Sequence, residues 1–332
     1  MLAEILRDAG YQVIVYTFHS FATQANLPGI DIFYHKSTAE LKEVFRKSDL
    51  IISNGELSLK CVMHAMLLHK KVICFYHMAL PYIKDRPGIK NSIQNIIRRF
   101  IVTYPVRHIT VSNAVTRALK LPKKISAKVI YNPVRSEALT LINESKHHSL
   151  PQPEYDILFC GRFIEGKGVL ILADALKILA KKNKSVRVLM IGEGKEEDFF
   201  KQKTALLESI SIDFKPFLAI GELIPEFNKA RVMVLPSYLH KEGSPLTLIE
   251  FMFTGKPVVI SDQPAMIETC GNTALVAKQG DALSLAEAID QILSDERLYK
   301  ELSFNTIAES SKFDPDNFRN EIIQLIKESF YQ

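Results

Sequence analysis

Short apolar runs rich in valine, isoleucine and leucine alternate with segments of helical periodicity along most of this 332-residue chain. Strands of this kind are buried on both faces, so the alternation predicts parallel sheets covered by helices on both sides, an α/β fold. The predicted strands are 12–18, 49–53, 71–76, 108–112 and 127–131 in the first half, and 155–160, 186–192, 232–236, 257–261 and 274–277 in the second. The helices predicted in the first half are 38–47, 57–69, 88–101 and 113–119.

A polar segment with two prolines, 144–154, separates two complete series of strands and helices. This composition is typical of a connection between domains, and the length of the chain fits two domains. We therefore predict an N-terminal domain over 1–149 and a C-terminal domain over 150–312. A last helix within 313–332 is expected to cross back onto the N-terminal domain.

A helix predicted at about 245–254 carries the strongest functional signal. Ser244 suits its N-cap and Pro245 its first position, while Gly255 suits the residue after its end. Gly243 and Ser244 lead directly into the N-terminus of this helix. The free N–H groups and the positive end of the helix dipole at that point form a site for an anion or for sugar hydroxyls.

Two glutamates flank this helix start. Glu242 lies just before the helix and Glu250 about two turns into it. Both can be read as solvated charges near a helix end. However, Glu250 lies in the apolar run LTLIEFMF, where a carboxylate requires an ionic or hydrogen-bonded partner, such as a ligand.

A second signal follows the strand 155–160. The loop GRFIEGKG presents Arg162 and Lys167 at the carboxyl end of that strand, where ligands of open α/β sheets bind. A planar guanidinium and a point charge together suit a diphosphate. The alternative is a surface turn with two solvated cations.

These motifs together resemble glycosyltransferase family 4 of the GT-B fold. GRFIEGKG, IGEG (191–194), LPS (235–237) and EGSPLTLIE occur in the order of that family, and Glu242-x7-Glu250 has its signature spacing. The resemblance is detailed over about 155–290 and looser over 1–150. It implies two Rossmann-like domains whose parallel sheets face a central cleft.

The resemblance also implies roles for individual residues. Arg162 and Lys167 would hold the donor diphosphate, Glu250 the ribose hydroxyls, and Glu242 the donor sugar. Transfer would retain the anomeric configuration, by front-face attack through an ion-pair-like transition state. The implied donor-binding set is Gly161, Gly192, Gly194, Gly243, Ser244, Pro245, Leu246 and Glu250.

The N-terminal domain is implied to bind the acceptor. His77 follows the strand 71–76, where the family often has a catalytic or sugar-contacting histidine, although a packed or solvated loop histidine is an equal alternative. Ser112 in TVSNAV and Asn132 in IYNPV resemble family landmarks. They are either cleft residues or simply caps and turn formers.

The charge of the chain is unevenly distributed. Residues 1–150 carry 21 Lys and Arg against 10 Asp and Glu, a net charge of +11, whereas the remainder carries a net charge of −6. Residues 84–128 hold eleven basic residues and one acid. This excess predicts attraction to the anionic inner leaflet of a membrane that carries a lipid-linked acceptor. Nucleic acid is the rival partner, but no nucleic-acid-binding motif accompanies the basic residues.

Composition favours a cytoplasmic protein attached peripherally to the inner face of the plasma membrane. No apolar run approaches the roughly 18 residues of a membrane span. The four cysteines are scattered and form no CxxC pair, which indicates reduced thiols. No metal is expected, because the Asp-x-Asp at 314–316 is interpreted as a helix cap and no His/Cys cluster has ligand spacing.

The predicted function is a retaining glycosyltransferase of the hexosyl or N-acetylhexosaminyl type. It would move a sugar from a UDP- or GDP-sugar to a saccharide or lipid-linked acceptor in a cell-surface glycan such as lipopolysaccharide or capsule. One alternative is another GT-B enzyme such as a phosphorylase. The other is a catalytically impaired scaffold that binds a nucleotide.

The N-terminus carries one further expectation. The opening LAEILRDAGYQVIVYT resembles the first helix and second strand of family 4 proteins, which normally begin with one more strand and a Gly-rich loop. That strand is central in a 3-2-1-4-5 order. Without it, the second and fourth strands of that order should lack their shared neighbour and expose two unpaired edges.

Overall fold

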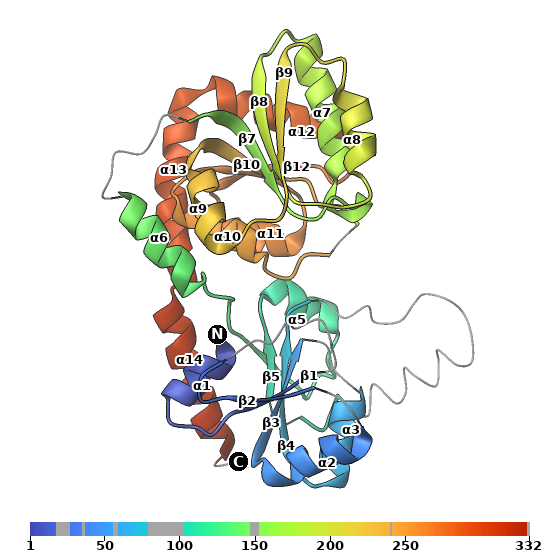
Figure 1. Cartoon of the computed structure of the whole chain (residues 1–332), viewed down its shortest axis with the longest axis vertical. Helices are drawn as coiled ribbons and strands as arrows, with labels where there is room; N and C mark the ends of the chain where they lie inside the picture. Colours follow the sequence, from blue (N-terminus) through green and yellow to red (C-terminus); the bar gives the residue numbers. More distant parts are fainter. Residues whose placement is uncertain are drawn as a thin grey trace, which may run out of the picture. The chain divides into compact units, whose positions relative to one another are not determined.

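The computed structural model describes residues 1–17, 27–34, 37–55, 59–78, 102–105, 107–146, 153–239 and 241–330. The chain forms two compact units: unit 1 is Met1–Ile130 with Asp316–Gln332, and unit 2 is Tyr131–Pro315. Figure 1 labels their elements. The helix expected at 88–101 lies outside the described residues.

The division falls after Ile130 and not near residue 149. Helix α6 (Ser136–Lys146) belongs to unit 2, because Ala138 and Ile142 are buried in the same core as Phe251. The predicted boundary segment 144–154 begins inside α6, and its last residues, Pro153 and Glu154, also belong to unit 2. The last helix, α14 (Pro315–Phe330), belongs almost entirely to unit 1.

Unit 2 contains one six-stranded parallel sheet in the order β12-β11-β10-β7-β8-β9. The strands β7 and β10 are adjacent at the centre of the sheet. The strands after β7 follow on one side of this pair and the strands after β10 on the other, so the order reverses between them. Ligands of doubly wound sheets bind at the carboxyl ends of the strands beside such a switch point. The strands are β7 (Tyr155–Cys160), β8 (Val186–Ile191), β9 (Ile210–Lys215), β10 (Ala230–Leu235), β11 (Val258–Ser261) and β12 (Ala274–Ala277).

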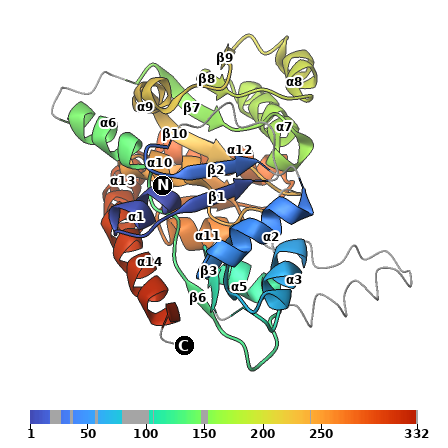
Figure 2. The same cartoon turned by 60° about the horizontal axis from the view of Figure 1, so that its bottom comes forward.

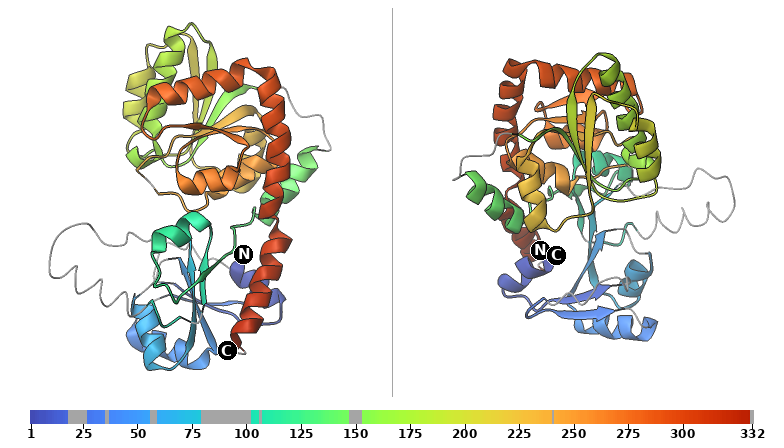
Figure 3. Two further views of the ribbon diagram at one scale, coloured as in Figure 1. Left: turned by 180° about the vertical axis from the view of Figure 1, so that it is seen from behind. Right: turned by 45° about the horizontal axis from the view of Figure 1, so that its top comes forward.

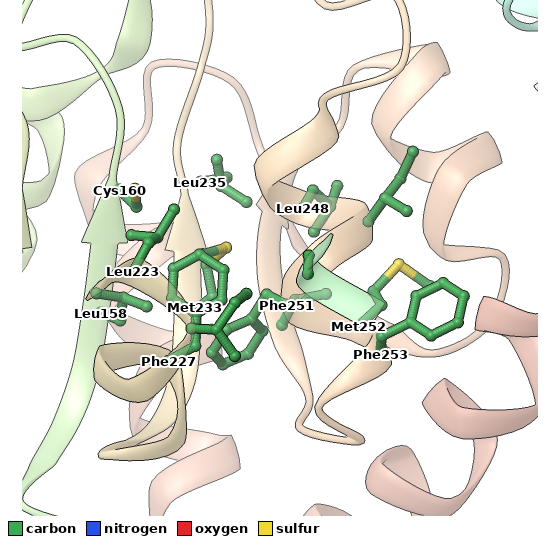
Figure 4. Packing of buried hydrophobic residues seen from close by; sticks show 14 of the residues in the cluster. Leu158, Cys160, Leu223, Phe227, Met233, Leu235, Leu248, Phe251, Met252 and Phe253 are labelled. Carbon is green, nitrogen blue, oxygen red and sulfur yellow. The ribbon is translucent and has the colours of Figure 1, made fainter. Parts of the chain in front are cut away.

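Helices cover both faces of this sheet. One face packs against α7 and α12, and the other against α6, α9 and α10. Figure 4 shows Leu248, Phe251 and Met252 of α10 among the side chains of β7, β10 and α9. The helical elements of unit 2 besides α6 are η1 (Glu165–Lys167), α7 (Val169–Lys181), α8 (Glu197–Thr204), α9 (Ile220–Asn228), α10 (Leu246–Phe253), α11 (Pro264–Cys270), α12 (Ala282–Ser294), α13 (Glu296–Ser310) and η2 (Ser311–Phe313).

Unit 1 contains two separate parallel sheets, β1-β2 and β3-β4-β5-β6. Its core includes Phe318, Ile322 and Leu325 of α14, which Figure 3 shows as the red helix beside the N-terminal helix. The strands are β1 (Ile14–Thr17), β2 (Asp31–Tyr34), β3 (Leu50–Gly55), β4 (Lys71–Tyr76), β5 (Arg107–Thr110) and β6 (Ala127–Val129). The other helices are α1 (Leu2–Asp8), α2 (Thr38–Lys47), α3 (Leu59–Leu67) and α5 (Asn113–Leu119).

The two sheets of unit 1 are not joined by a ladder in the part of the chain that the structure describes. There β1 pairs with β2 (Figure 2), and β3 pairs with β4. A cavity of about 560 Å³ is lined by Ile14 and Val15 from β1, by Leu50 and Ile52 from β3, and by residues of α1 and α14.

The predicted α/β class with two parallel-sheet units is confirmed, and each predicted strand is present with small shifts at its ends. Two strands were missed, β2 and β9. The start of the functional helix is also corrected: α10 begins at Leu246, with Pro245 as its extended N-cap residue, and Ser244 does not cap it.

Candidate active site

Three loops meet by backbone contact at the carboxyl edge of the unit 2 sheet. A Cβ on Gly192, after β8, would lie 2.0 Å from the carbonyl oxygen of Gly161, after β7. A Cβ on Gly194 would lie 2.3 Å from the oxygen of Phe163, and one on Gly168 would lie 2.0 Å from that of Pro236, after β10. Side chains are therefore excluded at Gly168, Gly192 and Gly194, because the backbone of a neighbouring loop fills the space that a Cβ would occupy.

An ion pair lies at this edge. Lys167 Nζ, in the short helix after β7, is 2.6 Å from Oε1 of Glu242, in the loop after β10. The two side chains are 15% and 7% exposed. Ser237 donates its hydroxyl to the same oxygen at 2.9 Å. The structure thus brings together two of the residues that the sequence singled out.

The loop that carries Glu242 is held in place by residues after β11. Gln263 accepts the N–H of Glu242 at 3.1 Å and donates to the carbonyl of Ser237 at 2.6 Å. Ser261 also donates to that carbonyl. Sequence reasoning named Ser237 only as part of the LPS motif and missed Ser261 and Gln263. These two lie at the carboxyl end of a predicted strand, the position that singled out Arg162.

The N-terminus of α10 follows this loop directly. Ser244 is 7% exposed, and its hydroxyl has no hydrogen-bond partner among the described residues. Gly243 is buried, Pro245 is partly buried, and Leu246 is 39% exposed at the first turn. Since buried polar atoms are nearly always hydrogen-bonded, the unpartnered Ser244 hydroxyl at the positive end of α10 indicates a place for a ligand oxygen.

Glu250 lies deeper, with no exposed surface. Arg135 donates to both of its carboxylate oxygens, to Oε2 at 2.9 Å. This hydrogen bond is the largest cause of the raised pKa of Arg135. The expected partner for Glu250 is therefore present, but it comes from a residue that sequence reasoning did not identify.

The remaining candidates have separate surroundings. Arg162 is exposed on the loop after β7, beside Gly161 at the same edge of the sheet. His77 belongs to unit 1, where its Nε2 lies 2.7 Å from Asn54 Oδ1 and its ring packs on Phe75. Ser112 is the N-cap of α5 and accepts the N–H of Val115, as the capping interpretation holds.

The described residues also bear on metal binding and on membrane crossing. Within those ranges, no group of three or more His, Cys, Asp and Glu side chains is arranged to hold a metal ion. None of the described helices combines the length and the apolar character needed to cross a membrane.

Comparison with known proteins places these motifs in a family. Residues 142–309 match the family described as Glycosyl transferases group 1, and residues 1–138 match the one described as Glycosyltransferase Family 4. The capsular polysaccharide biosynthesis glycosyltransferase CapM of Staphylococcus aureus is 23% identical over 306 residues, covering 79% of each chain. An uncharacterized glycosyltransferase of Methanocaldococcus jannaschii is 30% identical over 272 residues, covering 80% of this chain and 71% of the relative.

The fold is likewise similar to a solved one. The crystal structure of Anabaena HepE in complex with UDP superimposes with a TM-score of 0.79 at 18% identity, covering 98% of this chain and 95% of that one. The two family matches together span most of the sequence and the parallel-sheet units agree with them. The chain therefore belongs to the group 1 glycosyltransferases of family 4 and is a glycosyltransferase of the GT-B fold.

Proposed function

We propose that this enzyme transfers a sugar, with retention of anomeric configuration, from a nucleoside-diphosphate sugar to a saccharide or lipid-linked acceptor in the synthesis of a cell-surface glycan. The proposal rests first on one observation. The largely buried ion pair between Lys167 and Glu242 lies at the switch point of the unit 2 sheet, and the Ser244 hydroxyl, which has no partner among the described residues, lies on the same loop as Glu242.

This arrangement suits the donor chemically. The amides at the start of α10 and the Ser244 hydroxyl are oriented for oxygen atoms of a sugar or phosphate. Glu242 is a carboxylate acceptor for sugar hydroxyls, and Ser237 and Gln263 fix its position. Gly192 and Gly194 let the loop after β8 pack directly on the backbone of the loop after β7, which fixes the shape of this edge.

The reaction then depends on stabilising the leaving diphosphate. As the glycosidic bond breaks, negative charge grows on the diphosphate oxygens. Lys167 and the exposed Arg162 are the cations at this edge that balance that charge, which is electrostatic catalysis by preorganised groups. Front-face attack by the acceptor hydroxyl would pass its proton to the departing oxygen and retain the configuration. No metal ion is required in this scheme.

The class of acceptor is supported by the relatives and by charge. CapM is named for capsular polysaccharide biosynthesis. Residues 1–150 carry a net charge of +11, and Lys120, Lys123, Lys124 and Lys128 are exposed around α5 and β6. Several lysines near an anionic membrane attract it by about 1 kcal/mol each. Peripheral attachment to the inner leaflet would bring the enzyme to a lipid-linked acceptor.

A ligand screen tests the donor class. Thermal unfolding is measured with UDP, GDP and ADP, and hydrolysis is then measured with sugars carried on the nucleotide that stabilises the protein. We expect one nucleotide to raise the melting temperature and its sugar conjugate to be turned over equally well in EDTA. The anomeric proton of the released sugar, followed by NMR at early times, reports retention or inversion.

Two outcomes would contradict the proposal. Loss of turnover in EDTA would remove the metal-independent scheme, and an inverted first product would remove retention. A nucleotide that binds tightly while none of its sugar conjugates turns over would favour the alternative of a binding protein without catalysis.

A further inference from the structure

The cavity of unit 1 runs along one edge of β1. Four consecutive residues, Val13, Ile14, Val15 and Tyr16, line it. Successive side chains of a strand point to opposite faces, so only a space beside the strand is bordered by all four. None of the described residues that line the cavity belongs to β2, the partner of β1. The cavity therefore lies at the edge of β1 opposite β2.

This edge of β1 has no strand partner in the ranges that the structure describes. There the β1-β2 sheet consists of two strands. A strand at the end of a sheet presents a row of N–H and C=O groups that another strand can pair with. Two-stranded sheets are also marginally stable by themselves, and a third strand is usually needed. The edge of β1 is thus suited to an added strand.

The other walls of the cavity are mainly apolar. Helices α1 and α14, which lie side by side in Figure 3, form part of them, and Tyr11 after α1 stacks on Phe330 with ring centroids 6.1 Å apart. A segment that fills this space must itself be largely apolar, because polar side chains would lose hydrogen bonds to water. The apolar wall residues are Leu2, Ala3 and Leu6 of α1, Leu50 and Ile52 of β3, and Ile326 and Phe330 of α14.

The cavity is accessible from solvent. Gln12, Lys47 and Asp49 line it and are exposed, and they lie just before β1 and β3. The volume of about 560 Å³ falls within the roughly 300–1,000 Å³ of ligand-binding cavities. Ile14 and Val15 are only partly buried, although aliphatic side chains of a strand with two neighbours, such as Val232 in β10, are fully buried. A ligand would complete the burial of β1.

We propose that this cavity is a docking site for an extended, largely apolar peptide segment, which adds to β1 as the third strand of the β1-β2 sheet. Its backbone pairs with the edge of β1, and its side chains pack on α1, α14 and β3. Backbone pairing provides affinity in such strand addition, and the pockets on either side provide selectivity. About four or five residues, at about 3.3 Å each, match the length of β1 that borders the cavity. The donor chemistry of unit 2 takes no part in this inference.

The test uses the full chain and two synthetic peptides. The probe is KKVMVLVKK, whose centre copies the buried residues 232–235 of β10, a strand paired on both edges. The control is KKVMPLVKK, in which a central proline removes one N–H donor and disfavours pairing within a sheet. Calorimetry measures affinity, and hydrogen exchange followed by mass spectrometry locates the protected backbone.

We expect the probe to bind and to raise the melting temperature by about 3–6 °C at ten times its dissociation constant. Exchange in the segment that carries β1 should then slow about tenfold, since about nine molecules in ten are occupied. Exchange in β12, an end strand of the unit 2 sheet, should stay the same. The proline peptide should bind about tenfold more weakly or less, through the lost hydrogen bond and the broken pairing.

Two variants test the location. A3W places a large side chain in the cavity from α1 and should weaken binding of the probe at least about tenfold, because the space is filled. A39W is the matched control, since Ala39 is an exposed alanine of α2 in the same unit and does not line the cavity. It should bind the probe as the wild type does. If A3W does not fold, A3L serves and should show a smaller loss.

Each contrary outcome is distinct. No binding of the probe, or unchanged affinity in A3W, would overturn the docking site. Equal binding of the two peptides, or binding without protection of β1, would show a cavity that takes apolar material without strand pairing. A wild-type dimer that A3W but not A39W converts to monomers would make a second copy the occupant and the proposal wrong. None of these results changes the donor screen, so the proposed function stands or falls separately.

Discussion

Lys167 Nζ lies 2.6 Å from Glu242 Oε1, and the pair joins the loop after β7 to the loop after β10 with little exposure to solvent. In the absence of a ligand, each charge is compensated by the other. A nucleoside-diphosphate sugar bound as proposed would share Lys167 with Glu242. Lys167 would then balance the negative charge that grows on the diphosphate, while Glu242 would face the sugar.

Variants of this pair should show different effects on unfolding free energy and on turnover. K167M or E242Q alone removes one partner of a nearly buried pair, and a loss of the order of 3 kcal/mol in unfolding free energy is expected where a charge is left unpaired. The K167M/E242Q double variant should regain part of that loss, yet kcat should fall about 10²- to 10³-fold in all three. Urea unfolding and donor turnover measure the two effects. Full activity in E242Q would exclude it from the site.

Arg162 should behave differently, because it is exposed and contributes little to packing. R162A is expected to leave the melting temperature unchanged and to lower kcat about 10²- to 10³-fold, through loss of one electrostatic contact with the diphosphate. Arg187, exposed at the amino end of β8, provides the control R187A. Equal turnover in the two variants would argue against the role of Arg162.

The close approach at Gly192 predicts a large structural effect. Gly192 has φ 135°, and an added Cβ would lie 2.0 Å from Gly161 O. G192A should therefore destabilise unit 2 by about 1–3 kcal/mol from strain alone and more from the clash. The control is G221A, since a Cβ on Gly221, in α9, meets nothing within 4 Å, and alanine is the better helix former. A G192A protein as stable as G221A would contradict the contact.

Lys256 makes stability depend on pH. Its amine is buried and donates to Phe227 O and Asn228 O, and burial lowers its pKa from 10.5 to about 7. Between these values the unfolded chain binds a proton that the folded chain does not, so the unfolding free energy should fall as the pH drops from about 10 to 7.

K256M should remove that dependence. Urea unfolding of K256M at pH 7, 8 and 9 is therefore expected to show a flatter profile than the wild type, with the largest gain in relative stability at pH 7. K278M, at an exposed lysine, should follow the wild type. Parallel pH profiles for K256M and the wild type would show that Lys256 does not titrate in this range.

The lysines around α5 and β6 test the membrane proposal. Binding to vesicles with anionic lipid should weaken with added salt and should fall when Lys120, Lys123 and Lys124 are changed together to glutamine. Arg98 and Arg99, which lie outside the described residues, form a second set for the same substitution. Neutral vesicles provide the baseline. Binding that does not depend on salt and persists after both sets of changes would show that these basic residues do not attach the protein to the membrane.

The fold was predictable where strands are apolar on both faces. Val258–Ser261 is buried throughout, and its sequence alone identifies it. The missed strands β2 and β9 lie at the ends of their sheets. Along much of each strand, exposed side chains alternate with buried or partly buried ones. Such a short, half-solvated pattern is difficult to tell from a loop.

The positions of the candidate residues were predictable where one local motif carries them. Glu242 stands just before a helix start and the glycine loops at strand ends, which the sequence marks. Arg135 and Gln263 could not be identified in that way, because each acts on a residue in another element, 115 and 21 positions away. Only the packing of α6 and α11 on the sheet brings them to α10 and its loop.

The backbone contacts among the three glycine loops also matter for redesign of the enzyme. Gly161 and Phe163 after β7 face Gly192 and Gly194 after β8, while Gly168 faces Pro236 after β10. Because no side chain lies between them, a change in the length or path of one loop displaces the next. Grafting a single loop from a relative should therefore fail, whereas exchanging all three as a set preserves their fit.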